Sequence, residues 1–291
     1  MKVEEFLSSA TETLKQAQIE SPRLEVEMFM AEVLSCERSS LILRHNDELD
    51  LFSEDRLKGL LRRRQKGEPL AYILGYKDFY RDRFLVQPGV LIPRNETEML
   101  VECGESWIRS HGFKSPVIAD LGCGSGCLGL SLLKACGGKL LAVDAGEIPI
   151  RVSYQNCVNL GLEGETNFLQ CRVQDLSSNN LPPNWNMGEV DIVLANPPYI
   201  AESDPHVCPQ VRRTEPSQAL FAGKDGLQEI REWIPTIVTL LRPGGLLCLE
   251  HGAKQGEAVC KHLADSGHFE WIQSYRDLAG WDRMVTAKKK K

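Results

Sequence analysis

Residues 117–126 read VIADLGCGSG, and an apolar segment starting at Cys127 follows them directly. The apolar run 117–121 predicts a buried strand, and the segment after the glycines predicts a helix. Glycines let a backbone pass close to a ligand, and a helix N-terminus offers free N–H groups. The unit therefore suits a ligand that carries a nucleoside, although a purely structural turn has the same pattern. The residues expected to bind this ligand are Gly122, Cys123, Gly124, Ser125 and Gly126.

A second predicted strand, residues 139–143, ends in Asp144. A carboxylate at the tip of this strand can accept hydrogen bonds from both hydroxyl groups of a ribose. A dinucleotide-binding fold has an acid at the same point, but its third fingerprint glycine is missing here because Cys127 occupies that position. The pattern Asp-x-Gly-x-Gly-x-Gly, which begins at Asp120, instead resembles the first motif of methyltransferases that use S-adenosylmethionine.

The stretch DIVLANPPYI, residues 191–200, is the candidate substrate-binding segment. Its apolar part predicts a buried strand, which must end at Asn196 because two successive prolines lack the N–H groups that a neighbouring strand needs. Ligands of open α/β sheets bind beyond the carboxyl ends of the strands. The carboxamide of Asn196, the carbonyls of Pro197 and Pro198 and the ring of Tyr199 could there clamp a planar group that bears an NH2. The alternative is a proline-rich turn that only caps a core strand.

Further strands complete an α/β sheet. The additional strands are predicted at residues 167–171, 245–250, 269–272 and 283–286, with a turn at 242–244 and a hairpin-like final pair. The loop after the third strand would border an adenine through Asp175 or Leu176. His251 follows the fifth strand and is interpreted as a strand-end residue rather than as a metal ligand.

The chain before this sheet is predicted to be helical. Apolar residues recur at helical spacing, Ser21 and Ser53 are candidate N-caps, and Glu25 is the acid of the first turn after Ser21. The basic cluster 62–66 is interpreted as a solvated helix end rather than as a docking site for the ribosome or tRNA. The expected organisation is a helical substrate-docking domain at 1–75, a β-hairpin linker at 76–92 and a catalytic domain at 93–291.

Composition limits the possible functions. The chain has 291 residues, is 42% hydrophobic and 25% charged, and carries a net charge of −6, which disfavours a broad nucleic-acid-binding surface. The first residues do not form a signal peptide and no apolar run is long enough to span a membrane, so a cytoplasmic protein is expected. Ten scattered cysteines without a Cys-x-x-Cys pair predict buried thiols and no metal site.

Several motifs in order resemble those of the release factor glutamine N5-methyltransferases, the HemK or PrmC family. These motifs are EPLAYI at 68–73, LIPR at 91–94 with Glu96 to Glu98, DLGCGSG at 120–126, NPPY at 196–199, EP at 215–216 with Ala219, Leu220, Asp225 and Gly226, and DLAG at 277–280 with Asp282 and Arg283. The NPPY motif alone is shared with enzymes that methylate amino groups of DNA and RNA. Asn95 stands where the family commonly has a proline after the arginine at 94, and Ala145 and Gly146 follow Asp144 in place of a polar pair.

The resemblance implies a seven-stranded class I methyltransferase fold with a small all-α N-terminal domain and a β-hairpin linker. It implies S-adenosylmethionine as cofactor, S-adenosylhomocysteine as product, no metal, and class 1 peptide chain release factors as the protein substrate. The methyl group would go to the glutamine N5 of a Gly-Gly-Gln motif. No stable nucleic-acid or membrane binding and a monomeric state are expected, and a DNA or RNA amino-methyltransferase is the alternative.

The motifs and the resemblance together predict three sets of site residues. The cofactor would contact Gly122, Cys123, Gly124, Ser125, Gly126, Asp144, Leu176 and Asn196, the substrate would contact Asn196, Pro197, Pro198 and Tyr199, and catalysis would fall to Asn196, Pro197 and Tyr199. A carboxamide nitrogen is a poor nucleophile, so the site is expected to work by placing it against the methyl group, with Tyr199 stacked on the amide plane.

Overall fold

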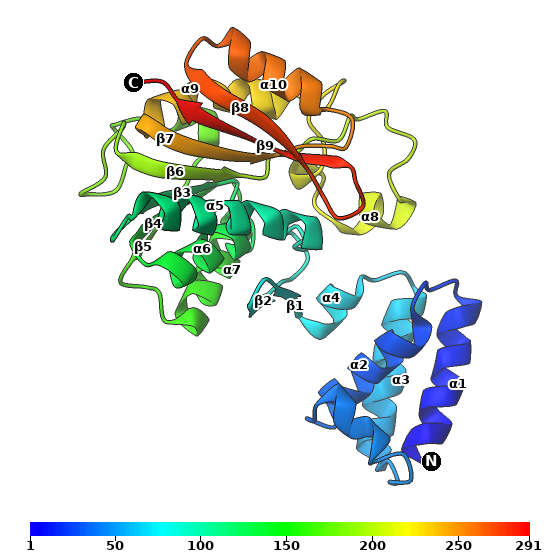
Figure 1. The fold of residues 1–291 in the computed structure, drawn as a ribbon. Coiled ribbons are helices and arrows are strands. Elements are labelled where there is room, and N and C mark those ends of the chain that lie inside the picture. Colours follow the sequence, from blue (N-terminus) through cyan, green and yellow to red (C-terminus); the bar gives the residue numbers. More distant parts are fainter. The chain divides into compact units, whose positions relative to one another are not determined.

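The computed structural model describes residues 1–291 and divides them into two compact units, Met1–Tyr76 and Lys77–Lys291 (Figure 1). Each unit has a hydrophobic core of its own, one in the first unit and two in the second. No helix of the chain combines the length and the apolar character that crossing a membrane requires.

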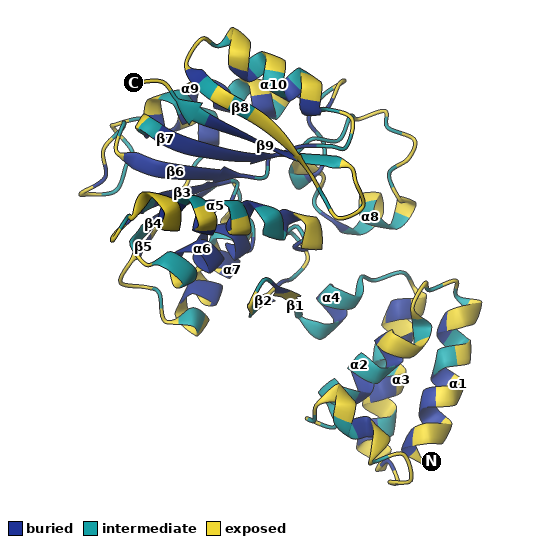
Figure 2. Ribbon diagram, in the orientation of Figure 1, coloured by how far each residue is buried: buried dark blue, intermediate teal, exposed yellow.

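The first unit is helical, as the apolar periodicity predicts. It consists of α1 (Val3–Gln16), α2 (Pro22–Val33), the 3-10 helix η1 (Arg38–Ile42), α3 (Leu51–Gln65) and the short α4 (Leu70–Leu74). The long helices each turn an apolar stripe toward one core and a polar face to solvent (Figure 2). Phe29, Met30 and Leu57 at its centre are completely buried.

Two details of the first unit differ from the expectation. Helix α3 begins after Asp50, whose carboxylate accepts a hydrogen bond from the backbone N–H of Ser53 at 2.9 Å, so Asp50 and not Ser53 is the cap. Arg64 of the basic cluster is not solvated. Its guanidinium donates to both carboxylate oxygens of Glu25 at 2.6 and 3.1 Å, and this pair joins α3 to α2.

Arg64→Ala is expected to lower the free energy of unfolding of the first unit by about 2 kcal/mol, because the Glu25 carboxylate would stay buried without its partner. The two side chains keep only 11% and 12% of their surface exposed. Arg62→Ala, at an exposed position two residues before Arg64, is the control. Hydrogen exchange of the amides in α2 and α3 of the full chain measures the loss, and equal exchange rates in both variants would contradict it.

The second unit is built on a seven-stranded sheet with the order β5-β4-β3-β6-β7-β9-β8 (Figure 1). The strands are β3 (Val117–Leu121), β4 (Lys139–Asp144), β5 (Thr166–Gln170), β6 (Val190–Ala195), β7 (Leu241–Glu250), β8 (Phe269–Arg276) and β9 (Asp282–Lys289). The first five are parallel, and β9 runs antiparallel to its neighbours β7 and β8. The predicted sheet and its antiparallel final pair are confirmed.

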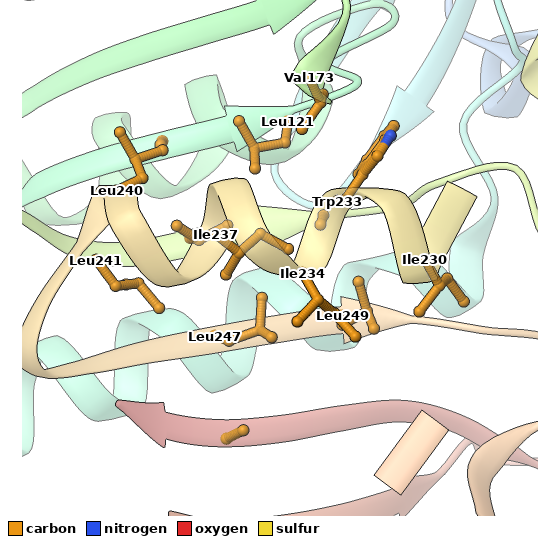
Figure 3. Packing of buried hydrophobic residues seen from close by; sticks show 14 of the residues in the cluster. Leu121, Val173, Ile230, Trp233, Ile234, Ile237, Leu240, Leu241, Leu247 and Leu249 are labelled. Atoms are coloured by element: carbon orange, nitrogen blue, oxygen red, sulfur yellow. The ribbon is translucent and has the colours of Figure 1, made fainter. Parts of the chain in front are cut away.

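Helices cover both faces of this sheet. They are α5 (Glu98–His111), α6 (Cys127–Cys136), α7 (Glu147–Leu160), α9 (Gln228–Leu240) and α10 (Gly256–Asp265), and the shorter elements are η2 (Asn95–Thr97), η3 (Val173–Asp175), α8 (Pro209–Thr214) and η4 (Ser217–Ala219). Successive strand residues point to opposite faces, so Ile118 belongs to the core under α5 and α6, whereas Ala119 belongs to the core under α9. Figure 3 shows Trp233, Ile234 and Ile237 of α9 within the second of these cores.

A β-hairpin precedes the sheet and is tied to it by side chains. It consists of β1 (Tyr76–Phe79) and β2 (Asp82–Leu85). The backbone N–H of Tyr80 donates to Glu98 at 2.9 Å, and the Tyr80 hydroxyl donates to Glu105. Asn156 of α7 accepts from the backbone N–H of Leu85 at 2.7 Å and donates to its carbonyl at 3.0 Å. Glu98 thus joins the hairpin to the start of α5.

Strand β7 starts earlier than expected. Val190 pairs with Leu241 and Ile192 pairs with Leu246, so the intervening residues of β7 form a bulge where a turn was predicted at 242–244. Along the sheet, the chain moves from β3 outward to β4 and β5 and then returns to place β6 on the other side of β3. This reversal is a topological switch point, and the carboxyl ends of β3, β4 and β6 there surround a ligand crevice.

Candidate active site

A cavity of about 870 Å3 lies beyond the carboxyl ends of β3, β4 and β6. This volume is typical of sites for cofactors and drug-sized ligands. Its walls come from the glycine turn after β3, the end of β4, the segment after β5, the NPPY segment, η4 and α9. The lining residues that matter below are Arg94, Thr97, Gly122, Cys123, Gly124, Ser125, Asp144, Val173, Gln174, Asn196, Pro198, Gln218, Glu229 and Trp233.

The glycine turn is held by the backbone of β4. The N–H groups of Gly122 and Cys123 both donate to the carbonyl of Val143, at 2.8 and 2.9 Å. Gly122 and Gly126 have φ angles of 71° and 79°, in the left-handed region that favours glycine. The turn therefore presents its backbone to the cavity. Gly122 to Ser125 line the cavity, whereas Gly126 lies just behind the lining.

Asp144 lines the cavity and also shapes it. Its Oδ2 accepts from the N–H of Gly124 at 3.0 Å, and its Oδ1 accepts from the N–H of Gly146 at 2.8 Å. Each carboxylate oxygen has a second lone pair, so both can still accept a hydrogen bond from a ligand hydroxyl. Burial raises the pKa of Asp144, and the hydrogen bonds from the backbone partly offset this effect.

Asp120, the first residue of the methyltransferase-like motif, lies behind the glycine turn. It is completely buried, and its Oδ2 accepts from the N–H of Gly129 at 2.8 Å while Oδ1 has no hydrogen-bond partner. Burial raises the pKa of Asp120 to about 7, and the neighbouring charge of Asp144 adds to the shift. The Asp120 carboxylate thus binds the first turn of α6, which follows the glycine turn, and does not line the cavity.

The cavity wall beyond β5 differs from the expectation for an adenine site. Leu176 is 5% exposed, belongs to the hydrophobic core and does not line the cavity. Val173 and Gln174, one short turn earlier, do line it. Trp233 of α9 forms the adjoining wall, and its indole N–H donates to Glu229 at 3.0 Å. Sequence reasoning missed Val173, Glu229 and Trp233, because nothing in their local pattern sets them apart from core or surface residues.

Asn196 lies in the cavity wall, at the end of β6. Its Nδ2 donates to the hydroxyl oxygen of Thr97 at 3.4 Å, across 99 residues of sequence. Because the amide nitrogen faces Thr97, the amide oxygen is the group left to accept a hydrogen bond from a ligand. Pro198 also lines the cavity, whereas the ring of Pro197 is buried.

Tyr199 has contacts other than those expected from the sequence. It does not line the cavity, and its hydroxyl donates to Oε1 of Glu250 at 3.1 Å. Its carbonyl accepts from Nε2 of Gln255 at 2.9 Å. Burial and the Glu250 carboxylate raise the pKa of Tyr199. The structure therefore supports a role in fixing the NPPY segment rather than stacking on a ligand. His251, beside Glu250, is completely buried at the end of the strand.

Glu215, which precedes η4, joins this part of the cavity wall to the segment before η2. Glu215 is buried and accepts from the backbone N–H of Ile92 at 3.1 Å and from the guanidinium of Arg94. Arg94 lines the cavity. The next residue, Asn95, which stands where the resembling family has a proline, accepts from Lys77 at 3.0 Å. These contacts hold the extended segment before α5 against the residues that precede η4.

The strand order, the glycine turn after the first strand and the acid at the tip of the second place the second unit among the methyltransferases. A family model described as "Methyltransferase small domain" matches residues 96–211 of the chain. A second one, described as "PrmC N-terminal domain", matches residues 5–75.

Curated relatives define the family more narrowly. The chain is 36% identical to the release factor glutamine methyltransferase of Moorella thermoacetica, over 99% of this chain and 98% of that protein. It is 34% identical to the protein of the same name from Bordetella pertussis, over 90% of this chain and 93% of that protein. It is 36% identical to the release factor glutamine methyltransferase of Neisseria gonorrhoeae, over 92% of this chain and 93% of that protein. The chain belongs to the release factor glutamine methyltransferase family.

Proposed function

We propose that this protein transfers the methyl group of S-adenosylmethionine to the side-chain amide nitrogen, N5, of the glutamine in the Gly-Gly-Gln motif of class 1 peptide chain release factors. The names of the relatives, matched over nearly their whole length, support this activity. The observation that carries the proposal is the position of Asn196 in the cavity wall, with its amide nitrogen turned to Thr97 and its oxygen available as an acceptor.

The cavity fits S-adenosylmethionine on grounds independent of the relatives. It is large enough, one wall is a glycine turn, and Asp144 has acceptor capacity left for two ribose hydroxyls. Gly122 to Ser125 and Asp144 would hold the nucleoside and the methionyl part, Val173 and Gln174 would border the adenine, and Asn196 would lie next to the reacting end. When bound, the cofactor supplies an activated methyl group on a positively charged sulfur.

The residues of this chain act on the glutamine by placement. Its amide nitrogen is a weak nucleophile because the lone pair is delocalised into the carbonyl. Asn196 Oδ1 and the carbonyl of Pro197 would accept its two N–H hydrogen bonds and so fix the direction of the nitrogen. The same carbonyl dipoles would stabilise the N–H groups as they become more acidic during transfer, and one of these protons would pass to solvent when the nitrogen gains the methyl group. Tyr199, held by Glu250 and Gln255, would keep the segment rigid.

Gly126→Ala tests the cofactor site. A Cβ at Gly126 would overlap the Ser153 hydroxyl and Leu130, and the left-handed φ adds about 1–2 kcal/mol of strain. We expect S-adenosylmethionine to bind roughly tenfold more weakly, because the turn would have to shift. Gly161→Ala controls for the backbone strain alone. Gly161 has a φ of 69°, and there is open space where the new Cβ would lie. Isothermal titration measures both, and equal affinities would contradict the prediction.

The remaining parts of the proposal concern partners and location. Residues 1–75 would help to dock the release factor, residues 76–92 would serve as the linker, and residues 93–291 would carry out the transfer. The protein would act as a monomer, in the cytoplasm where translation ends, without a metal and without stable binding to nucleic acid or membrane. The net charge of −6 disfavours the alternative of a DNA or RNA amino-methyltransferase, which would need a basic groove.

Incubation with S-adenosylmethionine and a purified class 1 release factor tests the proposed function. The intact mass of the release factor should rise by one methyl group in exchange for one hydrogen, and peptide mapping should locate the change at the glutamine of Gly-Gly-Gln. A release factor with that glutamine replaced by alanine is the control and should stay unmodified. Methylation of oligonucleotides, with no change in the release factor, would overturn the proposal in favour of the alternative.

A further inference from the structure

Glu250 is a buried carboxylate beside Asn196 to which the proposed mechanism gives no direct role. It is the last residue of β7, which runs parallel to β6, and the pairing of Leu249 with Ala195 brings Glu250 to the level of Asn196. Its surface is 1% exposed, and it does not line the cavity. Any effect of Glu250 on a ligand must therefore pass through neighbouring side chains.

One hydroxyl group of the site binds this carboxylate, and a second one affects its ionisation. The hydroxyl of Tyr199 donates to Oε1 at 3.1 Å. The hydroxyl of Thr97 is close enough to stabilise the ionised form and lower the pKa of Glu250. Oε2 is buried and makes no hydrogen bond, so the carboxylate retains an acceptor for the Thr97 proton.

The charge of Glu250 would favour one direction of the Asn196 amide over the other. An ionised carboxylate can only accept hydrogen bonds, so the Thr97 hydroxyl could direct its proton toward Glu250 and leave its oxygen as an acceptor. That oxygen then accepts from Asn196 Nδ2, as the structure has it at 3.4 Å. The amide oxygen consequently faces the cavity. A neutral, protonated Glu250 could donate to Thr97 instead and would permit the reversed amide.

We propose that the Glu250 carboxylate is the positioning residue of the active site, which through Thr97 and Tyr199 holds the Asn196 amide oxygen toward the substrate glutamine. This inference rests on the proposed function and deepens it, because it explains how a side chain that can face either way is fixed as an acceptor. Tyr199, bound to the same carboxylate, fixes the other end of the NPPY segment.

A purely structural role accounts less well for these contacts. Glu105 is a comparable buried carboxylate that receives a tyrosine hydroxyl, from Tyr80, but it also pairs with Arg81 and Arg109. Glu250 has no ion pair, whereas each oxygen of Glu105 pairs with an arginine. Burial raises the pKa of Glu250 to about 6, and Thr97, Tyr199 and Arg283 only partly offset this shift. An unpaired buried charge is costly, and such groups concentrate at functional sites.

The protonation of Glu250 provides the readout that distinguishes a positioning role from a purely structural one. The charged or titratable groups facing Glu250 are Tyr199, Arg283 of β9, Glu96 of η2 and Cys127 of α6. Burial raises the pKa of Cys127 to about 12 and also raises that of Tyr199, so both groups stay neutral where Glu250 changes its charge. Under this proposal the ionised form is the active one. The increase in kcat that ionised Glu250 provides should therefore be complete above pH 7 and should disappear as the pH falls through 6.

The test compares wild-type and Glu250→Gln enzymes at saturating S-adenosylmethionine and release factor between pH 5 and 8. At pH 8 we expect kcat to be roughly tenfold lower in the variant, with little change in KM for the cofactor. At pH 5 the ratio of wild-type to variant kcat should approach one. Taking the ratio cancels other acid groups of the site, such as Asp120 and Asp144, because both enzymes contain them. Glu105→Gln, the matched control, should give a ratio that does not depend on pH.

The outcomes separate this inference from the proposed function. If the wild-type enzyme does not methylate the release factor, the proposed function fails. If the wild-type enzyme is active and the Glu250→Gln ratio is the same at every pH, the inference about Glu250 is wrong. Should Glu250→Gln not fold, as circular dichroism would reveal, Thr97→Val and Thr97→Ser decide the question. Loss of kcat in Thr97→Val with recovery in Thr97→Ser supports the relay, and equal kcat in the two overturns it.

Discussion

Asn196→Ala is expected to lower kcat for release factor methylation by roughly two to three powers of ten, the scale of losing one preorganised polar group. Under the proposed mechanism, Asn196 Oδ1 orients the weakly nucleophilic amide and stabilises its N–H groups as the methyl group is transferred. Alanine leaves the end of β6 unchanged but removes this acceptor. The affinity for S-adenosylmethionine should change much less, because the glycine turn and Asp144 remain in place.

Single-turnover kinetics separate this effect from binding. With enzyme and cofactor in excess over release factor, the rate of methyl transfer itself should fall, and titration of the cofactor should give nearly the wild-type dissociation constant. Gln218→Ala is the matched control, since it removes another carboxamide that lines the same cavity from an exposed position. Full turnover in Asn196→Ala would refute the assigned role. An equal loss in both variants would attribute the effect to the cavity wall in general.

Sequence alone predicts where the chain presents its functional groups. The apolar runs, the glycines and the two prolines determine the ends of β3, β4 and β6, and parallel strands bring those ends to one edge of the sheet. Asp144 and Asn196 therefore reach one cavity, although 52 residues separate their numbers in the sequence. Local sequence patterns and the geometry of parallel sheets suffice to predict that these two residues meet.

Sequence alone does not predict the direction of a side chain or its distant partners. Tyr199 was expected to stack over the ligand amide, but a carboxylate 51 residues later in the chain binds its hydroxyl. The contact of Asn196 with Thr97 spans 99 residues. Likewise, Leu176 was expected at the adenine site, yet the 3-10 helix η3 turns Val173 and Gln174 to the cavity instead. Each of these contacts depends on the packing of the whole sheet.

The first unit also shows that sequence patterns do not predict the distant partners of a side chain. Arg64 lies in a run of three arginines that is typical of a solvated helix end, and only the packing of α3 on α2 brings it to Glu25. Ser53 is a residue type that often caps helices, but it lies three positions after the cap, where its N–H and hydroxyl both donate to Asp50. Patterns identify the helices, whereas their partners depend on how the helices pack.

Asp144→Ala is expected to raise the dissociation constant of S-adenosylmethionine roughly 100-fold, because the variant loses charge-assisted hydrogen bonds that each contribute about 1.5–3 kcal/mol. The carboxylate would bind the ribose hydroxyls of the cofactor. It also holds Gly124 and Gly146 by their N–H groups, so its removal loosens two walls of the cavity at once. Asp175→Ala is the control, since Asp175 is an exposed acid just after β5 that does not line the cavity.

The ionisation of Asp144 adds a second way to check this prediction. Burial raises its pKa, so its carboxylate gains a proton at a higher pH than an exposed aspartate does. A protonated carboxyl loses acceptor strength toward the ribose, and cofactor affinity should therefore weaken as the pH falls through the raised pKa. In Asp144→Asn the affinity should be low at neutral pH and should change less with pH than in the wild-type enzyme. Asp120 is present in both proteins, so its ionisation does not account for the difference. If titration calorimetry gives Asp144→Asn the wild-type affinity across this range, Asp144 does not bind the ribose as a charged acceptor.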